Sequence, residues 1–151
     1  MMRKTQSVTR ILSLVMSLLM VLSVINFPVL KAKAAGGVDG FVERCYKQAL
    51  GRNGEPSGIN YWVNILNNKE RTPAEVAYGF VFSIECVNKN LSNIEFTRML
   101  YRLYLGREAE AGGAEYWAAM LNNGQSRTNL VNSFASSQEF TNIVTSYGLS
   151  N

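Results

Sequence analysis

Apolar residues recur at helical spacing along the chain from residue 41 onward. Within each stretch they lie three and four residues apart, which places them on one face of an α-helix. No stretch alternates between apolar and polar residues for long enough to predict a strand. The sequence therefore predicts an all-α fold. The apolar stripes of the first half contain Phe41, Cys45 and Ala49, then Ile59, Trp62 and Ile65, then Val76, Phe80 and Ile84.

The helical pattern occurs twice, over residues 41–88 and again over residues 96–142. Such self-similarity indicates a repeated supersecondary unit. We expect three helices per repeat and six in all. One such unit alone would be marginally stable, so we expect one compact domain with a shared core and both tryptophans hidden at its centre. The matched residues are Tyr46 and Tyr101, Leu50-Gly51-Arg52 and Leu105-Gly106-Arg107, Gly58 and Gly113, Tyr61-Trp62 and Tyr116-Trp117, and Phe80, Ser83 and Glu85 with Phe134, Ser137 and Glu139.

Residues that start and stop helices agree with this pattern. Thr72–Glu75 and Ser92–Glu95 both have the capping-box arrangement, a hydroxyl side chain followed three residues later by glutamate. Gly51 and Gly106 follow an apolar stripe at the place where a helix commonly ends in a left-handed residue. We expect the last stretch, Glu139–Tyr147, to extend the final helix or to form a short helix of its own.

The first 34 residues have the features of a secretory signal. Basic residues precede an apolar run from Ile11 to Ile25, and Ala32-Lys33-Ala34 supplies the small residues that a signal peptidase recognises. We predict a signal-peptide helix over residues 1–34, with cleavage before Ala35. The alternative is an uncleaved anchor, because Ile11–Leu30 could cross a bilayer core of about 30 Å.

After this segment we expect a flexible lead-in over residues 35–40 and the two-repeat helical domain over residues 41–151. Removing residues 1–34 takes away five of the fifteen Lys and Arg residues and none of the Asp and Glu. The remaining residues contain ten Lys and Arg and eleven Asp and Glu, which gives a formal charge of −1. A nucleic-acid partner is not expected, because that function needs a basic surface. We expect a secreted protein, released or held at the cell surface by non-covalent contacts, with no further membrane contact; its oligomeric state stays open.

Three strings recur in both copies, namely Tyr-x-x-x-Leu-Gly-Arg, Gly-x-x-Tyr-Trp and Phe-x-x-Ser-x-Glu. Together they resemble the domain of unknown function 4214 family of bacterial secreted and surface proteins. More distantly they are similar to the linker domains of phycobilisome rods. The resemblance covers Phe41–Phe140 and departs from the family at Cys86 and at Pro56-Ser57. It implies an all-helical fold and an assembly or adhesion role, and it brings no catalytic residue.

The residue types argue against catalysis. The chain contains no histidine, the commonest general base and metal ligand. A glycosidase could use two glutamates, and Glu85, Glu115 and Glu139 are available, but Glu85 and Glu139 recur symmetrically, as structural contacts would. The loops Asn53–Ser57 and Glu108–Gly112 hold fewer carboxylates than a calcium loop needs. We therefore expect no enzyme activity, no cofactor and no metal.

Four side chains are candidates for binding a partner. Tyr61 and Tyr116 lie about 100° round their helices from the neighbouring tryptophans and should reach solvent. Arg52 and Arg107 could bind an acidic partner; alternatively each pairs with a glutamate in its own loop, Glu55 or Glu110. The leading hypothesis is a non-catalytic module that binds a protein or a cell-surface polymer. The alternative is a carbohydrate-binding module that uses the exposed tyrosines.

Cys45 and Cys86 are the only cysteines, and both lie in the first repeat. Repeat symmetry pairs them with Leu100 and Phe140, so the two thiols should approach each other if those two residues touch. An exported protein could form this disulfide, which would add roughly 4 kcal/mol of stability. Two buried free thiols that act as small hydrophobic residues are the alternative.

Overall fold

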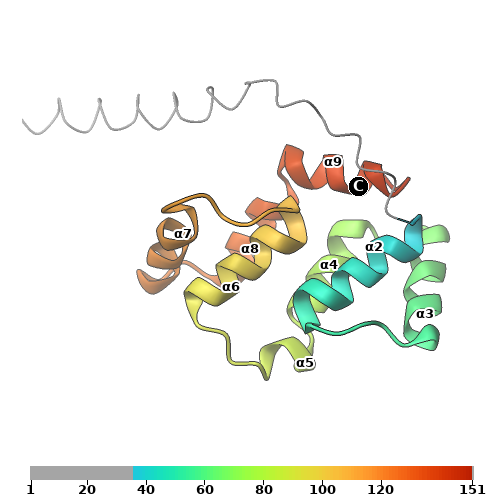
Figure 1. Cartoon of the computed structure of the whole chain (residues 1–151), viewed down its shortest axis with the longest axis horizontal. Coiled ribbons are helices and arrows are strands. Elements are labelled where there is room, and N and C mark those ends of the chain that lie inside the picture. The colour runs from blue at the N-terminus through green and yellow to red at the C-terminus, as the bar shows by residue number, and fades with distance from the viewer. Residues whose placement is uncertain (1–35, 151) are drawn as a thin grey trace, which may run out of the picture. The chain divides into compact units, whose positions relative to one another are not determined.

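Both repeats fold into helices in the same order along the chain (Figure 1). The computed structural model describes residues 36–150, so the predicted signal peptide and anchor lie outside the described residues. Repeat one contains α2 (Val38–Cys45), the π-helix η1 (Tyr46–Leu50), α3 (Pro56–Asn67), α4 (Pro73–Val81) and α5 (Ile84–Val87). Repeat two contains α6 (Asn93–Leu100), the π-helix η2 (Tyr101–Leu105), α7 (Gly113–Asn122), α8 (Arg127–Ala135) and α9 (Gln138–Ser146).

The all-α prediction is confirmed for residues 36–150, but the prediction of six helices is wrong. Each repeat has a fourth helix, which begins after Ser83 or Ser137. In repeat one this helix was not expected; in repeat two it is α9, and the alternative of a separate short helix over Glu139–Tyr147 is confirmed. Both serines have an extended backbone, and each hydroxyl accepts the backbone N–H three residues on, from Cys86 (3.2 Å) or Phe140 (3.1 Å). Serine at such a position starts a new helix. Ile84, which we placed on the third apolar stripe, consequently turns outward and is 80% exposed.

The predicted capping boxes and helix-ending glycines are confirmed, but the first helix begins at Val38, inside the stretch 35–40 that we expected to be a flexible lead-in. Thr72 and Ser92 both form complete capping boxes with the glutamates three residues later. The first helix of each repeat widens into a π-helix and ends at a left-handed glycine, Gly51 (φ 74°) or Gly106 (φ 72°). Glycine adopts this conformation without the steric cost of a Cβ atom. The described residues contain no helix that is long and apolar enough to span a membrane.

One hydrophobic core serves both repeats, as expected. At its centre the ring of Phe140, from α9, lies 6.4 Å from Phe41 of α2 and 4.8 Å from Tyr104 of η2. These three rings are fully buried. The last helix of repeat two therefore packs onto the first helix of repeat one, which joins the two copies into a single folding unit.

The two tryptophans do not meet at this centre, which corrects our expectation. Trp62 packs on Phe80 (5.4 Å between centroids) and Trp117 on Phe134 (5.8 Å), each within its own repeat. Both indoles are only partly buried at the edge of the core. They face their own repeats because α3 packs on α2 and α7 on α6, so that each tryptophan closes one side of the molecule.

We predict that Gly58→Ala lowers the free energy of unfolding by about 1–3 kcal/mol. A Cβ atom at Gly58 would collide with the hydroxyl of Tyr46. That tyrosine cannot move aside easily, because its ring packs edge-on against Phe80 at 4.8 Å. Urea unfolding of the variant and the parent chain measures the difference.

Gly79→Ala is the matched control, because Gly79 lies in α4 with no atom within 4 Å of the new Cβ position. There alanine should raise stability by about 0.5–1 kcal/mol through its better helix propensity. Equal effects of the two substitutions would contradict the close packing of Tyr46 on Gly58.

Candidate functional site

An arginine held between two glutamates occupies the same place in each repeat. In repeat one, Arg52 Nε and Nη2 donate to the two carboxylate oxygens of Glu85 at 2.6 and 2.8 Å. Its Nη1 donates to Glu55 at 2.7 Å and to the carbonyl of Asn53 at 3.1 Å. The guanidinium carbon lies 5.1 Å from the centroid of the Tyr46 ring. We call Tyr46, Arg52, Glu55 and Glu85 the Arg–Glu clasp of repeat one.

The Arg–Glu clasp of repeat two has the same geometry. Arg107 donates to both oxygens of Glu139 at 2.9 and 3.1 Å, and to Glu110 at 2.5 Å. It lies 5.1 Å from the ring of Tyr101. Tyr101 also donates its hydroxyl to Glu110 at 3.2 Å. Each clasp thus fastens the loop after the π-helix to the fourth helix of its repeat.

The clasps decide between the two interpretations of Arg52 and Arg107. The predicted pairing with Glu55 and Glu110 is confirmed, and all three guanidinium nitrogens of each arginine are engaged within the protein. Sequence analysis missed the second partner, Glu85 or Glu139. The available signal was that both glutamates recur at matching positions, although nothing in the sequence showed which side chain they meet.

The arginines also fix the charge of the clasp. Hydrogen bonds from Arg52 hold the pKa of Glu85 and of Glu55 below its usual value. In repeat two, burial raises the pKa of Glu110, but the charge and hydrogen bond of Arg107, a backbone hydrogen bond and the Tyr101 hydroxyl together lower it, and the net shift is downward. These three carboxylates are therefore ionised at neutral pH and poorly suited to act as general acids.

Tyr61 and Tyr116 reach solvent as predicted, with 57% and 48% of their surfaces exposed. Each ring meets the edge or face of the next tryptophan at close to a right angle, with centroids 5.1 and 5.3 Å apart. They lie on α3 and α7, which stand on opposite sides of the helical unit (Figure 1). The two tyrosines therefore form two separate surfaces instead of one shared site.

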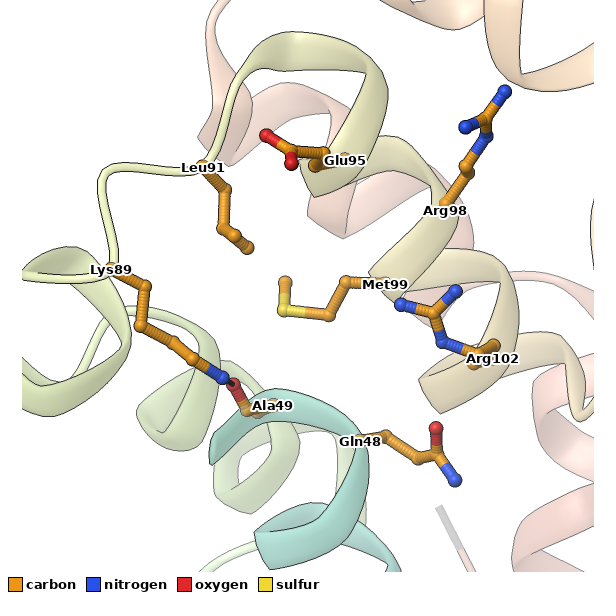
Figure 2. A pocket seen from close by; sticks show the side chains of 8 residues that line it. All are labelled: Gln48, Ala49, Lys89, Leu91, Glu95, Arg98, Met99 and Arg102. Atoms are coloured by element: carbon orange, nitrogen blue, oxygen red, sulfur yellow. Dashed lines mark hydrogen bonds between the residues drawn. The ribbon is translucent and has the colours of Figure 1, made fainter. Parts of the chain in front are cut away.

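A pocket that sequence analysis did not find opens where the two repeats meet. Its volume is about 240 Å³. Leu91 and Met99 reach into its middle, Lys89 turns onto the carbonyl of Ala49, and Arg98 points away (Figure 2). We call it the inter-repeat pocket; its lining residues are Gln48, Ala49, Lys89, Leu91, Glu95, Arg98, Met99 and Arg102.

The predicted disulfide is absent, because Cys45 and Cys86 are both free and buried in the structure. The Cys86 sulfur lies 3.8 Å from the sulfur of Met99 in repeat two, and Cys45 is fully buried in the core. Both cysteines thus match the alternative interpretation, as small hydrophobic residues of the core. Within residues 36–150 no cluster of three or more His, Cys, Asp or Glu side chains could hold a metal ion.

We predict that the stabilisation contributed by the Arg52–Glu85 pair is lost in acid. The pKa of Glu85 is lower in the folded chain than in the unfolded chain, so the pair stabilises the fold above the unfolded pKa and loses that effect as pH falls through the folded pKa. A double-mutant cycle of Arg52→Met and Glu85→Gln, measured by urea unfolding from pH 7 to pH 3, isolates this contribution. A coupling energy that stays constant over this range would contradict the prediction.

We predict that neither cysteine reacts with a thiol reagent such as dithionitrobenzoate while the chain is folded. Burial raises the pKa of the Cys45 thiol to about 12 and also raises that of Cys86, so little reactive thiolate forms. Both thiols should react once the chain is unfolded in guanidinium chloride. An intact mass that rises by two hydrogens on reduction would show instead that the disulfide exists.

Comparison with known proteins matches the two repeats to one family. The family described as Domain of unknown function (DUF4214) matches residues 33–90 and again residues 86–144. No curated protein and no solved structure matches the chain. The strings that carry the resemblance correspond in the structure to the clasps, the left-handed glycines and the packed tryptophans. Because its two copies span most of the sequence, the chain belongs to the DUF4214 family.

Proposed function

We propose that the chain is a non-catalytic binding module that joins protein partners at or outside the bacterial cell surface. The observation that carries this proposal is the placement of Tyr61 and Tyr116. These equivalent, exposed aromatic side chains belong to α3 and α7, which stand on opposite sides of the helical unit (Figure 1). Exposed tyrosines are typical of protein-binding surfaces. Two such surfaces facing apart suit a module that bridges partners.

The remaining exposed apolar side chains add to this argument. Among residues 36–150 the exposed large hydrophobic residues are Tyr61, Ile84, Val87 and Tyr116. Ile84 and Val87 belong to α5, and Val87 borders a surface pocket lined in part by Phe82 and Phe96. Large apolar side chains that a protein leaves in water commonly mark contact sites.

The distribution of polar groups supports a role without catalysis. The clasps use Glu85 and Glu139, the carboxylates that a glycosidase would need, as bidentate partners of arginine. Both clasps are alike, whereas an active site is usually present once. The pattern of residues 1–34 supports export, which would place the module outside the cell.

Carbohydrate binding is the alternative function. It is favoured by the exposure of both tyrosines, because an aromatic ring that reaches solvent can stack on a sugar. Against it stands the placement of the two tyrosines on α3 and α7, helices on opposite sides of the helical unit (Figure 1), which does not suit two rings that share one sugar chain. We therefore rank protein binding first.

A photo-crosslinking amino acid placed at Tyr61 or Tyr116 in the producing cell tests the proposal. We expect covalent adducts at both positions, and protease digestion should reduce the added mass to that of short peptides. Gln138, which is exposed on α9 and matches Ile84 by repeat symmetry, is the control position and should give no adduct. Adducts at neither tyrosine position would contradict the proposal.

Affinity electrophoresis in gels that contain polysaccharide tests the alternative, carbohydrate binding. Slower migration of the parent chain, lost in Tyr61→Ala and Tyr116→Ala, would favour carbohydrate binding. Unchanged migration in gels with every glycan tested would contradict carbohydrate binding.

A further inference from the structure

The inter-repeat pocket lies where the repeat symmetry is broken, and the difference between Arg44 and Met99 is the clearest case. In repeat one, Arg44 reaches across to η2, where its Nε donates to the carbonyl of Leu103 at 2.9 Å and an Nη donates to the carbonyl of Arg102. The matching residue of repeat two is Met99, which faces η1 beside Gln48 and Ala49. Methionine is shorter than arginine and donates no hydrogen bond. The space that a guanidinium fills on one side is therefore open on the other.

The wall of this pocket combines an apolar floor with a cationic rim. Leu91 and Met99 form the floor (Figure 2). On the rim, Lys89 donates to the carbonyl of Ala49 at 3.1 Å, which is one of the three donors of its ammonium group. Arg102 makes one side-chain contact among the described residues, a long 3.4 Å hydrogen bond to Glu108.

One carboxylate also lines the pocket, but its hydrogen bonds are made elsewhere. Glu95 Oε2 accepts from the backbone N–H and the hydroxyl of Ser92, which completes the capping box of α6. Those hydrogen bonds lower its pKa, so Glu95 carries a full negative charge against the positive charges of Lys89 and Arg102. Glu108 offsets part of the charge of Arg102, but Lys89 and Arg102 keep N–H groups that can donate to an anion.

We propose that the inter-repeat pocket binds a glutamate side chain of a protein partner. The methylene groups of the glutamate lie on Leu91 and Met99, and its carboxylate pairs with Arg102 and Lys89. This inference rests on the proposed protein-binding function and names the chemistry that the partner presents.

Three observations favour a glutamate over other anions. The volume of about 240 Å³ is below the range of roughly 300–1,000 Å³ that is typical of small-molecule sites, and it suits a single side chain. No aromatic residue lines the pocket, so an acidic sugar would find no stacking surface. An inorganic phosphate would leave the apolar floor uncovered.

Methyl NMR of the full-length chain, labelled with ¹³C at its methionine methyl groups, tests this proposal. The probe is the acetylated, amidated peptide Ala-Ala-Glu-Ala-Ala, and the matched probe replaces its glutamate by glutamine. We expect a saturable shift of the Met99 signal with the glutamate peptide, little shift with the glutamine peptide, and no shift of the Met120 signal. Equal shifts with both peptides, or none, would overturn the proposal, and so would a Met99 shift caused by inorganic phosphate or glucuronate instead.

Substitutions give the second arm of the test. Arg102→Gln removes a charge-assisted hydrogen bond and should weaken peptide binding about tenfold. Lys47→Gln is the matched control, because Lys47 matches Arg102 by repeat symmetry, pairs with Glu43 at 3.7 Å and does not line the pocket; its affinity should equal that of the parent chain. Met99→Arg should fill the pocket as Arg44 fills the equivalent space, keep the fold intact by urea unfolding, and abolish binding. Equal affinity of the Arg102→Gln and Lys47→Gln chains would contradict the assignment.

The crosslinking test separates failure of this inference from failure of the proposed function. If crosslinks to protein form at Tyr61 and Tyr116 while the glutamate peptide does not shift the Met99 signal, only the assignment of the pocket is contradicted. If no crosslinks form at either tyrosine, the proposed function falls as well.

Discussion

The fold depends on one repeated interaction, an arginine that is clamped between two carboxylates and laid on a tyrosine ring. A single exposed ion pair contributes little to stability, because water screens it and both side chains lose freedom. In each clasp, however, the guanidinium makes a bidentate contact to one glutamate, a second contact to another and a cation–π contact to a tyrosine. These contacts share one planar guanidinium group. Ordering that one side chain therefore holds together three segments of the repeat, namely the π-helix, the loop after it and the fourth helix.

The clasp also accounts for residues around it. The arginine follows a left-handed glycine, which turns the chain back toward the fourth helix. The tyrosine hydroxyl lies against Gly58 or Gly113, where any side chain would collide with it. The strings shared by the two copies therefore describe how a repeat is held together. They carry no information about what the protein binds, and this is why function must be sought in the exposed side chains and in the places where the copies differ.

The copies differ most where they touch. Tyr104 fills the shared core at the position of Ala49, Arg44 closes one side of the interface where Met99 leaves the other side open, and Lys89 replaces the apolar Ile143. Each copy packs against the other, so matching positions have different neighbours and need different side chains. The inter-repeat pocket is a consequence of this asymmetry.

The sequence alone determined the all-α class, the two repeats, both capping boxes and the left-handed glycines, because these depend on neighbours within about one helical turn. It also located the exposed tyrosines, since helical geometry sets the angle from Tyr61 to Trp62. The tertiary structure decided the rest. Glu85 lies 33 positions from Arg52, and the Cys86 sulfur lies against Met99 of repeat two. Such contacts follow from how the helices of residues 36–150 pack, and no local pattern records which residues that packing brings together.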